Sequence, residues 1–362
     1  MSEDLYYLGF SQFFGIGPRR FTQLIEKFGT AKKAWQGKER ELYPILKDVF
    51  TRKFLSFREE FDIKTCANEL QEKKIGWIPS TSHVYPKLLK QAKYPPFLLY
   101  YKGDVSMLNS EKPIAIVGTR KITDYGSVVT QMLTGDLVAN GFTIVSGLAL
   151  GVDAKAHMTT LQSGGKTIAV LGCGVDICLP RENQYIYDKI LITGGTVVST
   201  FLPGQGALIG SFPARNAIIA GLSLGVVVTE GAEDSGALIT AHDAEKLQRP
   251  VFSVPGPITS SLSKGTNNLL KKGAIAVTSA SEILDSLDII TKDKSQAIHH
   301  DRQIKGSTTE EQTVLDFLQP GPLHFDEIAR KIEKDSKTVG SLLSLMELKG
   351  MIRSIQGSMY SI

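Results

Sequence analysis

Seven short apolar runs, each separated from the next by a segment of helical pattern, constrain this chain more than any other feature of its sequence. They lie at residues 114–117, 142–145, 167–171, 196–200, 225–229, 250–254 and 274–278. Short apolar runs that alternate with helices are typical of buried strands in a parallel sheet. We therefore predict an α/β fold for this region, a doubly wound parallel sheet with helices on both faces.

The loop after the first of these runs carries the clearest chemical signal. Residues 114–117 are followed directly by Gly118, Thr119, Arg120 and Lys121. A glycine lets the backbone approach a ligand, free amides at the start of the next helix favour anions, and arginine offers a planar fork of donors that matches phosphate. In a parallel sheet such loops lie at the carboxyl edge, where ligands bind. We therefore predict an anion site at this turn.

Further small, basic and aromatic residues follow the other predicted strands. Because the carboxyl ends of parallel strands meet at one edge, we expect their loops to line a single glycine-rich crevice. Cations, amides and an aromatic ring together suit the phosphates and bases of a flexible nucleic-acid strand. The candidate binding residues are Gly118, Thr119, Arg120, Lys121, Ser146, Gly147, Arg181, Asn183, Phe212, Arg215 and Asn216.

Two of these candidates have an equally good explanation that involves no ligand. The Phe212 ring could pack in the hydrophobic core, as most large aromatic side chains do. Arg215 could form a salt bridge with an acidic neighbour such as Glu230. The residues alone leave both alternatives open.

Motifs of known enzymes fail in this sequence because of their context. Gly221-Leu-Ser223-Leu-Gly225 matches a hydrolase pattern, but it precedes a strand instead of following one. Gly172-Cys-Gly174 lacks the third glycine of a dinucleotide fingerprint. His157 and His242 lie early in predicted helices, where such histidines are more often packed or capping residues than acid-base groups. We therefore expect no catalytic residue, no cofactor and no metal site.

The residues before the predicted sheet have helical patterns and are expected to form a separate domain. Residues 1–75 have helical patterns, and Phe14-Gly-Ile-Gly-Pro18 is typical of the turn in a helix-hairpin-helix (SAM-like) unit. This turn could present backbone amides to a phosphate beside Arg19, Arg20 and Lys27, or it could serve packing alone. Residues 76–288 then form the sheet domain, in which the prolines and the aromatic run 97–101 predict an extra strand at its edge.

The end of the chain has its own pattern. Residues 289–306 are polar and are expected to form a linker. Residues 307–362 predict three helices and a terminal hairpin, which together make a winged helix. Ser336, Lys337, Thr338 and Ser341 would face a DNA groove if the third helix read DNA. Because that helix has a single early cation, with acidic residues close by, we favour a protein-contact or dispensable module over sequence-specific DNA reading.

Composition sets looser limits. The net charge of +4 permits a nucleic-acid partner without requiring one. Three cysteines offer neither a disulfide framework nor a zinc spacing, which favours the reducing cytoplasm. No apolar run reaches the ~18 residues of a membrane helix, and the first residues lack the features of an export signal. We expect a cytoplasmic protein without membrane contact.

Six segments of the sheet region together resemble one known family. They read GTRKITDYG, SGLALGVDAKAH, TIAVLGCGVDICLPREN, GSFPARNAIIAGLS, SGALITAHDA and VFSVPGP…KGTNNLLKKGA, and in this order they are similar to the DNA-processing protein A (DprA/Smf) family. The resemblance implies an extended Rossmann-like fold that binds single-stranded DNA, forms a homodimer and loads the recombinase RecA during natural transformation. Arg120 and Arg181 match the family's DNA-contacting basic residues, whereas Ala217 stands where many members have a second arginine.

Two classes of function follow. The first is a single-stranded DNA-binding protein that protects incoming DNA and acts in recombination. The second is a nucleotide phosphoribohydrolase of the lysine-decarboxylase-like type, with Glu230, Asp234 or Asp153 as its acid-base group. The sequence favours the first, since it lacks the Pro-Gly-Gly-x-Gly-Thr-x-x-Glu run of the second and carries two accessory domains. We therefore predict that the protein is not an enzyme.

Overall fold

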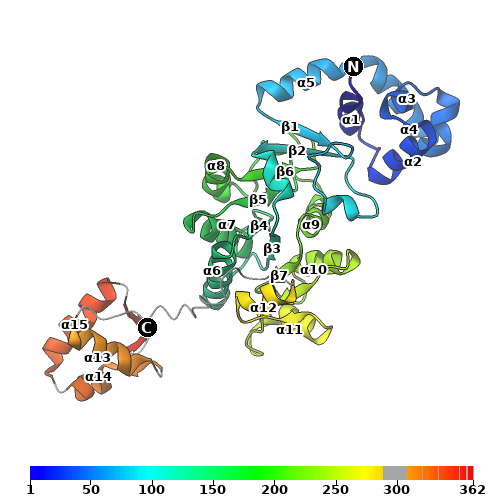
Figure 1. Ribbon diagram of the computed structural model, residues 1–362. Helices are drawn as coiled ribbons and strands as arrows, with labels where there is room; N and C mark the ends of the chain where they lie inside the picture. The colour runs from blue at the N-terminus through cyan, green and yellow to red at the C-terminus, as the bar shows by residue number, and fades with distance from the viewer. Residues whose placement is uncertain (288–307, 320, 333, 350, 356–357, 362) are drawn as a thin grey trace. The chain divides into compact units, whose positions relative to one another are not determined.

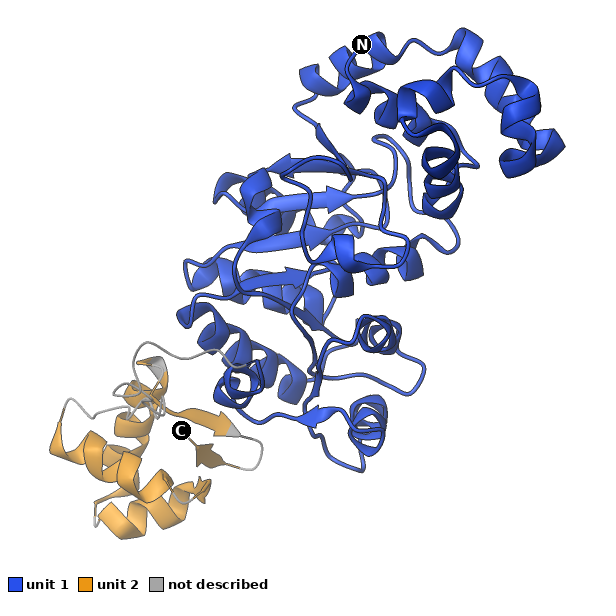
Figure 2. Cartoon of the chain, turned by 45° about the vertical axis from the view of Figure 1, so that its right-hand side comes forward, with its two compact units in different colours: residues 1–290 blue, residues 291–362 orange. Residues whose placement is uncertain are grey.

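A computed structural model describes residues 1–287, 308–319, 321–332, 334–349, 351–355 and 358–361. The chain divides into two compact units, residues 1–290 and 291–362, which are coloured separately in Figure 2. The predicted linker, 289–306, lies outside the described residues. Among the described helices none is long and apolar enough to cross a membrane.

The larger unit is built on a nine-stranded sheet with the order β1-β2-β6-β5-β4-β3-β7-β8-β9. Its parallel strands are β3 (Pro113–Val117), β4 (Thr143–Ser146), β5 (Thr167–Val170), β6 (Thr196–Ser199), β7 (Val226–Val228), β8 (Val251–Ser253) and β9 (Ile275–Ala276). All seven predicted strands are present and parallel, so the doubly wound sheet is confirmed (Figure 1). The order reverses between β3 and β7, and this reversal is the switch point where such sheets bind ligands.

Two antiparallel strands extend the sheet beyond β6. They are β1 (Gly76–Pro79) and β2 (Leu98–Gly103), and β2 pairs with β6 while β1 forms the outer edge. The strand predicted from the aromatic run is thus present as β2 and extends the sheet, although β1 and not β2 is the edge strand. The segment that leads into β2 contains Pro95 and Pro96. Proline has no backbone N–H to donate, so this segment does not join the hydrogen-bond ladder of the sheet.

Helices cover both faces of the sheet because alternate residues of each strand point to opposite sides. On β3, Ile114 and Ile116 pack toward one face, and Ala115 and Val117 pack toward the other. Figure 1 shows α6, α7 and α8 on one side of the sheet and α9 and α10 on the other. The helices of the first face are α6 (Asp124–Ala139), α7 (Val152–Gln162), α8 (Gln184–Ile192) and α12 (Ala280–Ser286). Those of the second are α9 (Ser211–Gly221), α10 (Ala237–Lys246) and α11 (Lys264–Lys271).

Single turns of 3-10 helix occur in the connections. They are η1 (Leu89–Gln91), η2 (Val105–Asn109), η3 (Arg181–Asn183) and η4 (Ser261–Ser263). Of these, η3 lies in the loop after β5 and leads directly into α8, so it brings one predicted site segment to the carboxyl edge.

Five helices precede the sheet. They are α1 (Glu3–Gln12), α2 (Pro18–Phe28), α3 (Ala31–Trp35), α4 (Glu39–Glu60) and α5 (Ile63–Glu72). The predicted hairpin turn joins α1 to α2. Arg20 donates from Nη1 to the Gly15 carbonyl oxygen at 2.6 Å and lies over the Phe50 ring, and Lys27 donates to the Glu41 carbonyl oxygen at 2.5 Å. Two of the three cations proposed for phosphate contact there are therefore engaged within the helical region.

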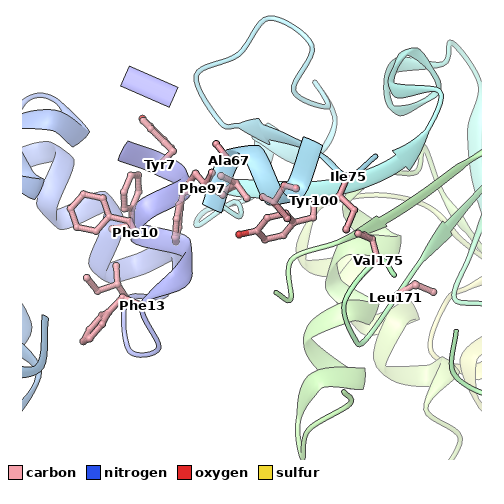
Figure 3. Packing of buried hydrophobic residues seen from close by; sticks show 14 of the residues in the cluster. Tyr7, Phe10, Phe13, Ala67, Ile75, Phe97, Tyr100, Leu171 and Val175 are labelled. Carbon is pink, nitrogen blue, oxygen red and sulfur yellow. The ribbon is translucent and has the colours of Figure 1, made fainter. Parts of the chain in front are cut away.

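These helices share one hydrophobic core with the sheet. The rings of Phe21, on α2, and Phe97, just before β2, stack with their centroids 4.1 Å apart. Tyr100, fully buried on β2, forms hydrogen bonds through its hydroxyl with Ser11 Oγ at 2.6 Å and Gln12 Nε2 at 2.7 Å. Figure 3 shows Phe97 and Tyr100 between the aromatic residues of the helices and the residues of the sheet domain. The helices and the sheet therefore form one compact unit.

The smaller unit has the elements of the predicted winged helix. They are α13 (Thr309–Leu318), β10 (Leu323–His324), α14 (Phe325–Ile332), α15 (Ser336–Leu348), β11 (Arg353–Ile355) and β12 (Met359–Ser361), with strand order β10-β12-β11. On α15, the proposed reading helix, Thr338 donates to Asp335 and Ser341 donates to the Lys337 carbonyl oxygen. Two of its hydroxyl groups are thus already hydrogen-bonded within the helix region.

Candidate nucleic-acid interface

Three loops are joined at the switch point of the sheet. Thr119, after β3, donates from its backbone N–H to the Glu230 carbonyl oxygen, after β7, at 2.7 Å. The Thr119 carbonyl oxygen accepts from the backbone N–H of Val152, which begins α7 after β4, at 3.1 Å. The Glu230 side chain also accepts from both the N–H and the hydroxyl of Thr123, at 2.9 and 2.6 Å. The turn that carries Arg120 is therefore fixed from two sides.

Three cations lie in the loops at this edge of the sheet. Arg120 and Lys121 follow β3, Arg181 follows β5, and all three are exposed. Within the described part of the chain, no hydrogen bond or ion pair engages their charged groups. Their positive charges are therefore available to an anionic ligand.

The Phe212 ring lies between the exposed and the buried parts of the site. It belongs to the first turn of α9 and is half-buried. The guanidinium carbons of Arg120 and Arg215 lie 5.3 and 5.9 Å from its centroid, within cation–π range. On its inner side, Gly172 is close enough that a Cβ atom there would lie 3.1 Å from the ring. Phe212 is therefore neither a pure core residue nor a free surface ring.

Arg215 is buried, with 5% of its surface exposed. Its Nη1 donates to the carbonyl oxygens of Gly147 and, at 2.7 Å, of Val170, and its Nε donates to Asn216 Oδ1 at 3.1 Å. Burial lowers the pKa of Arg215, and the Asp153 carboxylate raises it in part. The guanidinium thus connects three segments under the loop tips.

Asp153, and not the example Glu230, is the acidic side chain whose charge acts on Arg215. The Asp153 carboxylate is buried and accepts from the N–H groups of Gly147 and Ala149, at 3.1 and 3.3 Å. Burial raises its pKa, and Arg215 and these N–H groups oppose the rise. A Cβ atom on Gly147 would lie 2.2 Å from Arg215 Nη1 and 2.7 Å from the Asp153 carboxylate, so only glycine fits there.

The remaining predicted residues form the inner wall of the site. Ser146, Asn183 and Asn216 are buried, and each donates from its side chain to a backbone carbonyl of another segment. Their acceptors are, in turn, Ile116 at 2.6 Å, Leu148 and Ala149 at 2.8 and 3.0 Å, and Gly236 at 3.1 Å. The structure places these residues in and next to the loops at the carboxyl edge of the sheet, where their side chains hold the loops together.

Known sequences now identify the chain. A family model described as DNA recombination-mediator protein A matches residues 77–288, which is more than half of the chain. The chain belongs to this family. A second model, the DprA winged helix domain, matches residues 299–358. The resemblance to DprA/Smf proteins is therefore confirmed, and so is the winged helix at the carboxyl end.

Two curated relatives match more than half of the chain. Protein Smf of Synechocystis sp. is 38% identical over 294 residues, which are 80% of this chain and 74% of that protein. The DNA processing protein DprA of Bacillus subtilis is 40% identical over 217 residues, 60% of this chain and 73% of its own.

Two solved structures of family members have the same fold. DprA from Streptococcus pneumoniae has a TM-score of 0.69 and 34% identity, and the match covers 79% of this chain and 98% of that one. DprA from Helicobacter pylori has a TM-score of 0.54 and 32% identity, and the match covers 59% of this chain and 95% of that one. Its structure concerns its mode of binding single-stranded DNA.

The carboxylates proposed for a hydrolase have other roles or positions. Glu230 is buried and holds Thr123 at the start of α6, and Asp153 is buried beside Arg215. Asp234 is exposed in the loop after β7. Two of the three candidates are thus engaged inside the protein and do not open onto the loop tips where a substrate would lie.

Thr123 was not among the predicted site residues, although the sequence carried a signal for it. Its hydroxyl accepts from the Gly126 N–H at 3.1 Å and so caps α6, as a threonine before a helix commonly does. The same hydroxyl donates to Glu230. The capping pattern predicts that the turn after β3 ends at Thr123. It does not predict that Thr123 contacts Glu230, on the other side of the switch point.

His157 is a packed residue beneath the site. Thr167 Oγ1 donates to the Ile144 carbonyl oxygen, so it accepts from His157 Nδ1–H at 2.8 Å, while no residue that the structure describes forms a hydrogen bond with Nε2. Burial, and after it the charge of Arg215, lower the pKa of His157 to about 3. The imidazole is therefore neutral in the folded protein.

This burial predicts a loss of stability in mild acid. Unfolded chains protonate histidine near its ordinary pKa of 6.5, whereas folded His157 does so only near 3, so the unfolded state binds more protons between these values. The contribution of neutral His157 to the free energy of unfolding is complete above pH 6.5, and it falls by about 1.4 kcal/mol for each pH unit below that value. Between pH 7 and pH 5, the free energy of unfolding should fall in both proteins, but by roughly 2 kcal/mol less in His157→Gln than in the parent. Urea denaturation at the two pH values measures this difference. Equal drops in the two proteins would contradict it.

Proposed function

We propose that the chain binds single-stranded DNA at the carboxyl edge of its parallel sheet, without strong sequence preference, and that it acts as a binding protein and not as an enzyme. The observation that carries this proposal is the set of three exposed cations, Arg120, Lys121 and Arg181, whose charged groups form no hydrogen bond or ion pair with the described residues, together with the half-buried Phe212 ring beside Arg120. Phosphates are held by such cations, while an aromatic surface accepts bases of any identity.

A single strand suits this site better than a duplex. The cations are distributed over loops after two strands of the sheet, and the ring is recessed beside them. Only an unpaired base can turn its flat face toward a recessed ring, because the bases of a duplex are stacked on one another. The single-stranded DNA binding of the Helicobacter pylori relative supports the same choice.

We further propose that the protein protects incoming DNA and loads RecA onto it during natural transformation, in the cytoplasm and as a homodimer. Membership of a family of recombination mediators supports the role in recombination. A symmetric pair of sites in one particle would hold a long strand more tightly than a single site.

The proposal predicts salt-sensitive binding. Each phosphate neutralised on a single strand contributes about −0.7 to the slope of log affinity against log salt, so three cations give a slope of roughly −2. Fluorescence anisotropy with a labelled oligodeoxythymidylate, repeated over a fourfold range of salt, measures this slope. A duplex of the same length should bind more weakly at every salt concentration. Binding that is insensitive to salt would contradict the proposal, and release of free base from nucleoside monophosphates would favour the hydrolase instead.

A further inference from the structure

An exposed apolar turn stands next to the proposed site. It runs from Leu208 to Ser211, with Leu208 half exposed and Ile209 fully exposed. The Leu208 N–H donates to Ser211 Oγ at 3.2 Å, the Ser211 N–H donates to the Leu208 carbonyl oxygen at 3.0 Å, and Gly210 has a φ of 88°. Two hydrogen bonds and a left-handed glycine thus close the turn and hold Ile209 at its tip. We call Leu208 and Ile209 the apolar tip.

The apolar tip lies at the same edge of the sheet as the cations. It follows β6, a parallel strand, and ends where α9 begins, so Phe212 is the third residue after Ile209. A second exposed apolar residue, Leu150, lies in the loop after β4, two residues before Val152, which is hydrogen-bonded to the arginine-bearing turn. Exposed apolar side chains therefore occur in two of the loops that surround Arg120.

The site needs apolar surface beyond the ring of Phe212. The Phe212 ring is half-buried, with two guanidinium carbons within 5.9 Å of its centroid and Gly172 against it, so it can receive one base at most. Phosphates bound to Arg120 and Arg181 would leave the attached bases projecting from the backbone into the same region. Bases removed from their own stack gain from contact with any apolar surface.

We propose that the apolar tip contacts the bases of the bound strand, with Ile209 as the main contact. This inference rests on the proposed function and deepens it, since it divides the site into a part that holds phosphates and a part that holds bases. Aliphatic side chains offer no hydrogen bonds to base edges, so the contact stabilises every base alike and gives no sequence preference.

DNA fits the apolar tip better than a protein partner does. The tip is small, only two residues long, and it is continuous in sequence with the ring that flanks the cations. A stable protein interface needs an apolar patch of several hundred square ångströms, roughly, whereas a base requires only a side chain or two.

Ile209→Ser tests the inference, with Ile192→Ser as the matched control. Ile192 is 84% exposed and ends α8 just before β6, so it lies at the opposite, amino edge of the sheet. We expect Ile209→Ser to bind an oligodeoxythymidylate roughly tenfold more weakly, because about two methylene-sized groups lose their apolar contact. The salt slope should be unchanged, since no charge is lost. Ile192→Ser should bind as the parent does.

An abasic strand of the same length separates base contact from phosphate contact. On it, Ile209→Ser and the parent should bind equally, because the bases that the side chain would touch are missing. Arg120→Ala should bind both strands more weakly and lower the magnitude of the salt slope by about 0.7. Thermal melts of all the variants should coincide, since the changed side chains are exposed.

Each outcome has one meaning. Parent-like binding of the thymidylate by Ile209→Ser, together with a loss in Arg120→Ala, would overturn the inference and leave the proposed function in place. A loss that persists on the abasic strand would also overturn it. A change in sedimentation with unchanged DNA binding would assign the apolar tip to a contact between copies of the chain. If Arg120→Ala also binds as the parent does, the proposed function itself fails.

Discussion

Replacing Arg120 and Arg181 together by alanine is expected to abolish measurable binding of single-stranded DNA. Both guanidinium groups are exposed and form no hydrogen bond or ion pair with the described residues, so each is free to make a charge-assisted hydrogen bond to phosphate. Such a contact contributes roughly 1.5–3 kcal/mol, or about ten- to a hundredfold in affinity, for each arginine. Arg120→Ala alone should therefore weaken binding by about that factor. Arg120→Lys should recover only part of it, because an ammonium lacks the planar fork of donors.

Anisotropy titrations of the four proteins measure these losses, and Lys166→Ala is their control. Lys166 is an exposed cation that directly precedes β5, at the amino edge of the sheet. Its replacement by alanine should leave DNA binding unchanged. The melting temperatures should match that of the parent, since exposed loop-tip cations contribute little to packing. A double variant that binds as tightly as the parent would show that this edge of the sheet is not the DNA site.

Replacing Arg215 by alanine should cause a large loss of stability, unlike the replacement of Arg120, which should weaken DNA binding and leave stability unchanged. It would leave the Asp153 carboxylate buried without its cation, remove the donor to the carbonyl oxygens of Gly147 and Val170, and open a cavity. Removing one partner of a buried charge pair costs about 3–5 kcal/mol. Urea denaturation of the larger unit measures this difference, with the exposed Arg120→Ala as the comparison for loss of an arginine.

A double-mutant cycle isolates the charge pair. Asp153→Asn in the Arg215→Ala background removes the stranded carboxylate while keeping an acceptor for the Gly147 N–H. We expect it to recover part of the lost free energy of unfolding, so the two changes should be far from additive. Strict additivity, or a loss in Arg215→Ala no larger than that in Arg120→Ala, would show that the pair does not stabilise the site.

The parallel sheet was predictable because its strands are local signals. Each is a short apolar run that ends at small residues, and strands buried on both faces need no alternation of polar and apolar positions. The meeting of the loops followed from the same argument, since the carboxyl ends of parallel strands share one edge. The exposed positions of Arg120 and Arg181 are consistent with that reasoning.

The buried layer under the loops was less accessible to sequence reasoning. Arg215 lies three residues before Ile218 and four before Ile219, on the inward face of α9, so its burial had a helical signal. A cation on such a face is usually at the surface, however, and its carboxylate partner belongs to another helix. The link between Glu230 and Thr123 likewise spans 107 residues. Contacts of this range are set by the three-dimensional packing and have no local pattern.

The shared core of the helices and the sheet has an evolutionary consequence. Phe97 stacks on Phe21, and among the described residues the hydrogen bonds of the Tyr100 hydroxyl come from Ser11 and Gln12 of α1. A descendant that lost the helices would expose one ring to water and leave the other without its hydrogen bonds, so both positions would have to change at the same time. Gene fusion or domain exchange at the junction near residue 75 is therefore constrained by two side chains that lie beyond it in the sequence.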